Sequence, residues 1–131
     1  MKTFFDTNVL VYASQADPKG TVARALLAEG GVVSVQVLNE FVSVSRRKLR
    51  RAWPEIETAV GFFLSLLPTP VPLTMETHLA ARRLASSHQI SFYDALIVAA
   101  AIQAGCGRLL SEDLQNGFQL KGLRIENPFL P

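Results

Sequence analysis

The sequence predicts an α/β fold, a three-layer α/β/α sandwich in which helices cover both faces of a short, mainly parallel central sheet. Short, almost wholly apolar segments alternate with longer helical segments, which is the pattern of buried parallel strands joined by helices. A chain of 131 residues is long enough to bury one hydrophobic core. No repeat, linker or low-complexity tract divides it, so we expect a single domain over residues 1–131.

Strands are expected where short apolar runs lie between helix signals. The run at 71–73 contains Pro72, which lacks a backbone donor and therefore favours an edge position. The expected strands cover residues 4–5, 32–33, 71–73, 108–110 and 123–125.

Helices are expected where capping residues precede periodic apolar positions. Ser34 and Thr74 are suited to N-caps, Pro54 to a first helical turn, and Gly105 to a helix end. The segment 17–20 contains Pro18 and Gly20 and is expected to break the chain between two helices. The expected helices cover residues 7–13, 21–29, 35–51, 53–67, 75–88 and 91–104.

Composition excludes several classes of protein. The net charge is only +2, too small by itself to indicate a polyanionic partner. The single cysteine, Cys106, cannot form an internal disulfide, which favours a reducing, cytoplasmic setting. The longest apolar run, 95–104, is far shorter than the roughly 20 residues of a membrane span, so no membrane segment is expected.

Two aspartates follow expected strands directly or closely. Asp6 comes after the first strand, and Asp113 follows the strand at 108–110. In open parallel sheets the ligand crevice lies beyond the carboxyl ends of the strands, so both carboxylates are candidates for one site. Each is equally explained as a helix N-cap when taken alone.

Two further acids lie on expected helices. Glu40 falls just outside the apolar arc of its helix and is positioned to face a cleft rim; the alternative is an ordinary solvated glutamate. Asp94 lies at the N-terminal end of an apolar stripe, an unusual place for a charge. The alternative for Asp94 is a capping box with Ser91, and the two roles can coexist.

Four converging carboxylates would repel one another and require a compensating charge. Ligation by oxygen atoms alone suits Mg²⁺ or Mn²⁺. His78, His88 and Cys106 are too few and too far apart for a zinc cage. A divalent cation held by carboxylates lowers the pKa of bound water and stabilises charge on a phosphate, so the four acids predict phosphodiester hydrolysis.

Four motifs together resemble the PIN-domain family. They occur in the family's order and at suitable spacing over nearly the whole chain: 6–10 (DTNVL), 39–41 (NEF), 93–95 (YDA) and 111–114 (SEDL). The resemblance implies a metal-dependent endoribonuclease, most similar to the VapC-type toxins of bacterial toxin–antitoxin pairs. It also implies an RNA substrate, a cognate antitoxin protein as partner, and a homodimer.

Carried over residue by residue, the resemblance assigns the metal ion, Mg²⁺ or else Mn²⁺, to Asp6, Glu40, Asp94 and Asp113. Thr7, Asn8 and Ser111 are implied to orient these ligands. The family pattern favours Asp113 over its neighbour Glu112. Many relatives have a further acid after this motif, where this chain has Gln115 and Asn116, so one metal ion and two both stay open.

A basic run ends the helix that carries Glu40. It contains five of the thirteen Lys and Arg residues of the chain. RNA phosphates next to the metal centre would be attracted to it; the alternative is favourable pairing with the helix C-terminus on a solvated face. The candidates are Arg46, Arg47, Lys48, Arg50 and Arg51.

Large apolar residues gather on the next helix, and we expect most of them in the core. This half of the chain resembles the region of PIN-family proteins that contacts the antitoxin and the second subunit. Part of the group is therefore expected at an interface. The group consists of Trp53, Phe62, Phe63, Leu66 and Leu67.

Two other functions fit parts of the pattern. A phosphatase of the haloacid-dehalogenase type also begins with a strand that ends in aspartate, but its D-x-D motif would need an acid where this chain has Asn8. A non-catalytic module would use the acids as caps and the basic run to hold nucleic acid or a partner. Such a module would bind RNA in EDTA without cleaving it.

Overall fold

A computed structural model describes residues 1–131 and has the expected α/β architecture. Its central sheet has four strands in the order β1-β2-β4-β3. The pairs β1–β2 and β2–β4 are parallel, and β3–β4 is antiparallel, so the sheet is short and mainly parallel as predicted. The strands are β1 (Thr3–Phe5), β2 (Arg108–Leu110), β3 (Gln119–Leu120) and β4 (Leu123–Glu126).

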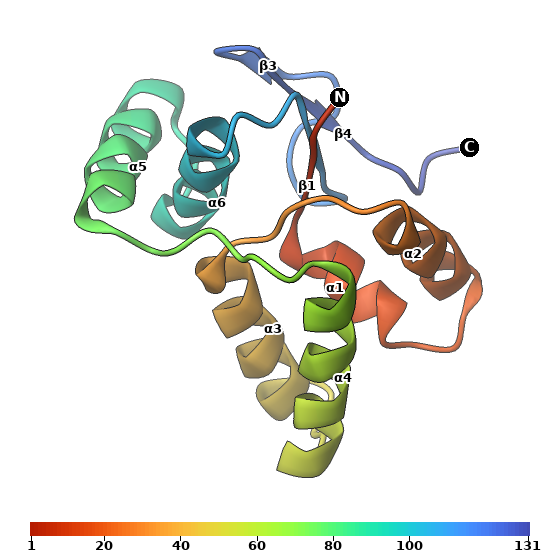
Figure 1. Cartoon of the computed structure of the whole chain (residues 1–131). Coiled ribbons are helices and arrows are strands. Elements are labelled where there is room, and N and C mark those ends of the chain that lie inside the picture. Colours follow the sequence, from red (N-terminus) through yellow and green to blue (C-terminus); the bar gives the residue numbers. More distant parts are fainter.

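Six helices surround this sheet (Figure 1). The pair α5 and α6 packs on one side of the sheet and the pair α1 and α2 on the other, while α3 and α4 extend side by side beyond the carboxyl end of β1. The bounds are α1 (Thr7–Ala13), α2 (Pro18–Ala28), α3 (Val35–Arg47), α4 (Trp53–Leu66), α5 (Met75–His88) and α6 (Phe92–Gln103).

The predicted caps account for most helix starts. The side chains of Ser34, Thr74 and Ser91 accept hydrogen bonds from the third residue of α3, α5 and α6, respectively. Each cap satisfies a backbone donor that has no partner inside its helix. These three predicted starts are therefore confirmed.

Two helix boundaries differ from the prediction by three residues or more. The second helix begins at Pro18 rather than at residue 21, because Asp17 caps it and proline fits its first turn. The third helix ends at Arg47 rather than at residue 51. Arg50 adopts a left-handed backbone (φ 53°), and the N–H of Arg51 turns back to the carbonyl of Ser45 at 2.9 Å.

The strand predictions at 32–33 and 71–73 are wrong. Each segment contributes only one isolated bridge, Val32 beside Phe4 and Val71 beside Ser34. Both segments lead directly into the N-cap of a helix, which ends their pairing, and Pro72 also removes a ladder donor from the second segment. The short strand β3 has no apolar pattern and was not predicted.

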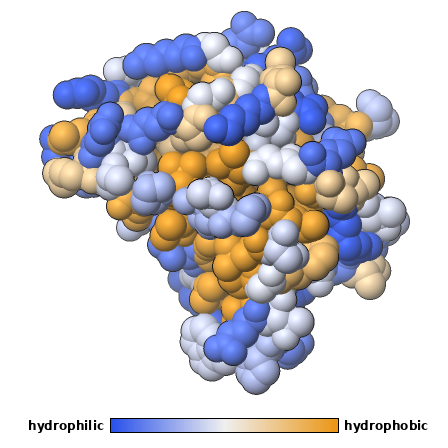
Figure 2. Space-filling view, in the orientation of Figure 1, coloured by the Kyte–Doolittle hydropathy of each residue, from blue (hydrophilic) through white to orange (hydrophobic).

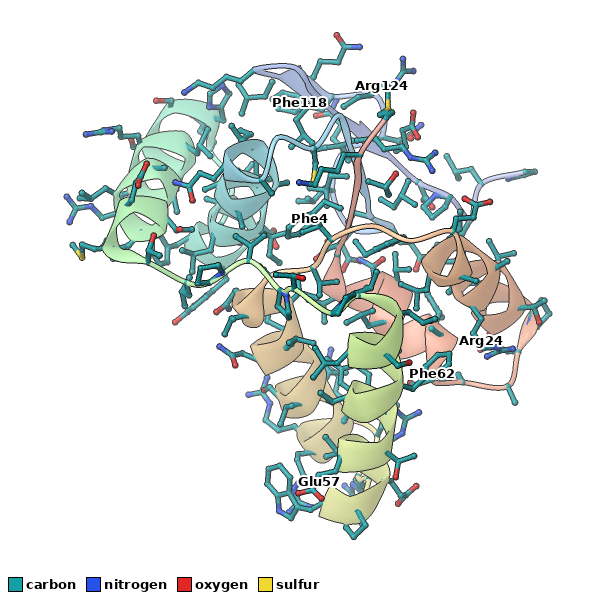
Figure 3. The ribbon with its side chains drawn as sticks, viewed as in Figure 1. Phe4, Arg24, Glu57, Phe62, Phe118 and Arg124 are labelled. Carbon is teal, nitrogen blue, oxygen red and sulfur yellow. The ribbon has the colours of Figure 1, made fainter.

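One core of 26 buried residues joins the sheet to all six helices. Phe4, labelled at the centre of Figure 3, is fully buried in it.

The large apolar residues of α4 and its C-terminal end are only partly in this core. Phe63 and Leu67 are buried, whereas Trp53 and Phe62 are exposed. Figure 2 shows apolar residues gathered on this face over α4 and the segment after it. No helix reaches the length and apolarity that a membrane crossing needs.

Candidate functional site

The four candidate acids line one cleft of about 360 Å³. Asp6 directly follows β1 and Asp113 follows β2, and these strands are neighbours in the sheet. Glu40 enters the cleft from α3 and Asp94 from the first turn of α6. The fold thus brings together four carboxylates that lie up to 107 positions apart in the sequence, in the crevice expected of an open parallel sheet.

Asp6 is the buried member of this group, only 4% exposed. Its Oδ1 accepts a hydrogen bond from the backbone N–H of Thr7 at 2.7 Å. Its Oδ2 accepts one from the hydroxyl of Ser111 at 2.6 Å, which joins the ends of β1 and β2. Asp6 also occupies the N-cap position of α1, so the predicted alternative role coexists with its place in the cleft.

Burial raises the pKa of Asp6 to about 6. Loss of solvation is the main cause, and the negative charges of Glu40 and Asp94 raise the pKa further. The hydrogen bonds from Ser111 and Thr7 oppose this shift without cancelling it. A cation bound beside Asp6 would lower this pKa and so favour the charged carboxylate.

Asn8 links the two strand-end aspartates. Its amide Nδ2 donates to Oδ2 of Asp113 at 3.2 Å and lies 3.4 Å from Oδ2 of Asp6. Its Oδ1 accepts the backbone N–H of Glu112 at 3.1 Å. A neutral amide therefore holds the loop after β2 against the start of α1 and spaces the two carboxylates.

Ser111 holds the same loop through hydrogen bonds of its buried hydroxyl. It is fully buried, and its Oγ accepts the backbone N–H groups of Asp113 and Leu114 at 3.1 and 3.2 Å while donating to Asp6. One hydroxyl thus fixes Asp6 and the backbone that carries Asp113.

Glu40 is held by two side-chain donors. The hydroxyl of Thr7 donates to Oε1 at 3.0 Å, and the amide of Gln36 donates to Oε2 at 3.1 Å. Gln36 lies one turn before Glu40 on α3 and is itself 8% exposed. These contacts fix Glu40 toward Asp6, so it is not the freely solvated glutamate of the alternative interpretation.

The carboxylate of Asp94 makes no hydrogen bond to the protein. Ser91 caps α6 by accepting the backbone N–H of Asp94 at 3.2 Å, but the reciprocal bond of a capping box is absent. The carboxylate of Asp94 is therefore available to the cleft.

The chain contains no group of three His, Cys, Asp or Glu side chains placed close enough to hold one metal ion together. The four carboxylates share a cleft, and the amide of Asn8 lies between those of Asp6 and Asp113. Closer approach of the carboxylates would raise their mutual repulsion unless a cation were present.

Glu112 lines the same cleft but takes part in an ion pair of its own. Its Oε1 bonds to the ammonium of Lys19, which also lies over the ring of Tyr12 at 4.8 Å from the centroid. The hydrogen bond from Lys19 lowers the pKa of Glu112 below its ordinary value. Glu112 lines the cleft with its charge already compensated.

We expect Glu112→Gln and Asp113→Asn to differ in their effect on Mg²⁺ binding. Glu112→Gln should leave the affinity nearly unchanged because Lys19 already neutralises Glu112. Asp113→Asn should lower the affinity by about tenfold or more because it removes an uncompensated carboxylate. Isothermal titration with Mg²⁺ measures both variants, and a larger loss for Glu112→Gln would contradict this assignment.

The side chains of the basic run lie in different surroundings. Lys48 lines the carboxylate cleft, and Arg47 lines a second cleft next to it. Arg46 instead lies over the ring of Trp53 at 4.9 Å from its centroid. Arg51 donates to the hydroxyl and carbonyl of Ser14 at 2.7 and 3.1 Å, and so ties the end of α3 to the end of α1. Arg50 is exposed.

This division predicts different effects for two substitutions in the run. Lys48→Ala should weaken RNA binding and reduce the slope of log affinity against log salt by about 0.7, with no loss of stability. Arg51→Ala should instead lower the free energy of unfolding by about 1–2 kcal/mol, because it leaves the Ser14 carbonyl without its partner. Salt-dependent anisotropy and urea unfolding separate the two effects, and equal behaviour of the variants in both assays would contradict the division.

Several residues that line the cleft or contact its acids were not among the sequence candidates. Gln36 supports Glu40, Lys19 engages Glu112, and Tyr12 and Gln15 line the wall. The spacing of Gln36 and Glu40, one helical turn apart, is a usable signal for their contact. The contact between Lys19 and Glu112 spans 93 positions and has no local signal.

The fold and the cleft define an α/β protein with a group of carboxylates at the carboxyl ends of parallel strands, where open sheets of this kind bind their ligands. The model of the PIN domain family matches residues 3–118. The chain therefore belongs to the PIN domain family, as its four motifs predicted. No curated protein sequence matches the chain.

Solved structures with the same fold include several toxin–antitoxin proteins. A toxin–antitoxin complex from Klebsiella pneumoniae has a TM-score of 0.73 at 18% identity, covering 98% of each chain. VapBC2 from Rickettsia felis, bound to a promoter DNA fragment, has a TM-score of 0.70 at 23% identity and covers 97% of this chain and 98% of its own. The sarcin–ricin-loop-cleaving toxin VapC20 of Mycobacterium tuberculosis has a TM-score of 0.68 at 21% identity and covers 82% and 87%.

Proposed function

We propose that this PIN domain is a Mg²⁺-dependent endoribonuclease and the toxin of a toxin–antitoxin pair. The observation that carries the proposal is the single cleft shared by Asp6, Glu40, Asp94 and Asp113, with Asp6 buried at its base. The fold shared with a toxin named for cleaving the sarcin–ricin loop supports RNA as the substrate class. We assign the whole unit, residues 1–131, to this function.

The residues of the cleft fit a hard divalent cation. The four acids offer only oxygen donors, and none of them takes part in an ion pair within the chain. We assign Mg²⁺, with Mn²⁺ as the substitute, to Asp6, Glu40, Asp94 and Asp113. Bound there, the ion would supply positive charge for the phosphate and lower the pKa of a water molecule.

The chain's own residues would prepare the site for this reaction. Ser111 and Thr7 hold the two oxygens of Asp6, and Thr7 with Gln36 holds Glu40. Because these donors are fixed by folding, the carboxylates need little rearrangement when substrate arrives. Lys48 at the rim would attract the phosphate backbone.

The proposal predicts that RNA cleavage requires an added divalent cation. Purified protein should cleave single-stranded RNA in Mg²⁺ or Mn²⁺, and EDTA should abolish cleavage because the four carboxylates would be left without a compensating charge. Gel analysis of a labelled RNA measures this effect, with heat-denatured protein as the contamination control. Binding that persists in EDTA without any cleavage in Mg²⁺ would favour the non-catalytic module instead.

A haloacid-dehalogenase-type phosphatase is less well supported. That mechanism needs an acid two positions after the first aspartate, and this position is Asn8. The amide of Asn8 bridges Asp6 and Asp113 and cannot protonate a leaving group. The PIN family membership favours the nuclease.

We propose two protein partners, a cognate antitoxin and a second copy of this chain. The support is the complexes VapBC2 from Rickettsia felis and VapBC from Salmonella typhimurium, which share this fold. The exposed apolar residues Phe62 and Leu64 of α4 are candidate contacts for the antitoxin. In this role the protein would act in the cytoplasm, where its RNA substrates occur.

A further inference from the structure

A second cleft of about 520 Å³ adjoins the carboxylate cleft. Glu40 and Val44 line both clefts, so the two are separated only by this part of α3. The remaining lining residues are Gln36, Asn39, Ser43 and Arg47 from α3, and Tyr93 from α6.

Tyr93 presents an exposed aromatic ring to this cleft. Tyr93 is 63% exposed, although it directly precedes Asp94. The ring is supported on one side by Phe92, at 5.7 Å between centroids, and Phe92 packs in turn against His78 at 5.3 Å. The hydroxyl of Tyr93 makes no hydrogen bond within the chain. A ring held by its neighbours but left open to solvent is suited to stacking against a flat ligand.

The facing side of α3 is polar and without internal partners. Asn39, Ser43 and Arg47 are spaced four residues apart and therefore share one face of the helix. None of the three side chains makes a hydrogen bond or ion pair within the chain. They offer an amide, a hydroxyl and a guanidinium, which are the groups that contact base edges and phosphates.

We infer that this second cleft binds one unstacked base of a single-stranded RNA, next to the bond that is cut. The ring of Tyr93 stacks on the base, Asn39 contacts its edge, and Arg47 contacts the adjoining phosphate. This inference rests on the proposed ribonuclease function and adds a site that selects the flanking nucleotide. The polar, cationic lining and the direct connection to the carboxylate cleft favour RNA over an apolar protein segment.

The test measures RNA binding and RNA cleavage separately. A short fluorescent single-stranded RNA is titrated in EDTA, where only binding is observed, and kcat and KM are measured in Mg²⁺. Tyr93→Ala should weaken binding by about tenfold and raise KM similarly, since stacking on one base contributes about 1–3 kcal/mol. Tyr93→Phe keeps the ring and should bind nearly as wild type, whereas Tyr93→Leu keeps the bulk without the π face and should behave like Tyr93→Ala.

Phe62→Ala is the matched control. Phe62 is also an exposed aromatic residue, 44% exposed, but it lines a different cleft between α4 and the helices α1 and α2. Its removal should leave RNA affinity unchanged. Equal losses for Phe62→Ala and Tyr93→Ala would indicate unspecific hydrophobic binding and overturn the assignment of the second cleft.

An abasic scan identifies the base that Tyr93 contacts. One abasic position at a time is introduced along the RNA, and each RNA is titrated in EDTA with wild type and with Tyr93→Ala. At one position the abasic substitution should weaken binding to wild type by about tenfold and have almost no further effect on Tyr93→Ala.

The outcomes separate this inference from the proposed function. Cleavage by wild type, with losses that add independently at every abasic position, overturns the base site and leaves the nuclease intact. Absence of cleavage with coupled losses in binding overturns the nuclease and leaves the base site intact. Unchanged RNA binding by Tyr93→Ala, together with weaker binding of a partner protein, assigns the cleft to that protein and overturns the inference.

Discussion

Asp6→Asn should reduce Mg²⁺-dependent RNA cleavage by about 10³-fold while the protein stays folded. Asparagine has the shape of aspartate, and its Oδ1 can still accept the N–H of Thr7. The negative charge is lost at the most buried position of the cleft, where no other carboxylate can replace it. Mg²⁺ affinity should therefore fall together with cleavage. Both are measured on the same preparation, by calorimetric titration and by cleavage of a labelled RNA.

Asp17→Asn is the matched control for this substitution. It also converts one aspartate to asparagine, but at the N-cap of α2, where asparagine caps equally well and keeps the bond to the N–H of Gly20. Its cleavage activity and Mg²⁺ affinity should equal those of wild type. Undiminished cleavage by Asp6→Asn would contradict both the metal assignment and the proposed function.

The metal-free protein should lose stability as the pH rises from 4 to 7, and Asp6 should cause much of this loss. The pKa of Asp6 is about 6 in the folded protein against 3.8 for an unperturbed aspartate, so the folded state binds the proton more tightly. This contribution to stability is fully present below pH 3.8 and disappears as the pH passes 6. Two pKa units correspond to at most about 3 kcal/mol.

Urea unfolding of wild type and Asp6→Asn between pH 4 and 8 isolates this contribution. In metal-free buffer the stability of wild type relative to the variant should fall over the interval from pH 4 to 7. Mg²⁺ at pH 7.5 should then stabilise wild type and leave the variant unchanged, because ligand binding adds stability only to a folded state that binds it. A stability difference that does not vary with pH would show that the charge of Asp6 is not destabilising.

Local patterns were sufficient for most of the helices. Ser34, Thr74 and Ser91 are caps whose geometry depends on three neighbouring residues, and all three are confirmed. The apolar strand 108–110 was likewise visible in the sequence. The errors in strand prediction occurred where pairing partners decide the outcome. The segments around Val32 and Val71 were predicted as strands, but each forms only one isolated bridge.

The apolar residues of α4 show a second property that the local sequence does not predict, namely which of two neighbouring side chains is buried. Phe62 and Phe63 are adjacent and chemically identical, yet one is 44% exposed and the other 1% exposed. Composition predicts that such residues are mostly buried, whereas the rotation of the helix against Phe41 of α3, at 5.0 Å between ring centroids, selects which one. Figure 3 shows Phe62 on the side of α4 that faces Arg24 of α2.

The sequence by itself singled out the four candidate acids, because Asp6 and Asp113 follow strands, Glu40 and Asp94 lie at unusual positions on helices, and all four lie in motifs that resemble those of the PIN family. The tertiary structure decided how these acids are held: Ser111 and Asn8 join the ends of β1 and β2, Gln36 and Thr7 hold Glu40, and Lys19 pairs with Glu112. Residue type and local periodicity depend on neighbours along the chain. Most of these contacts join residues 33 to 105 positions apart, and only the packing of the whole core brings them together.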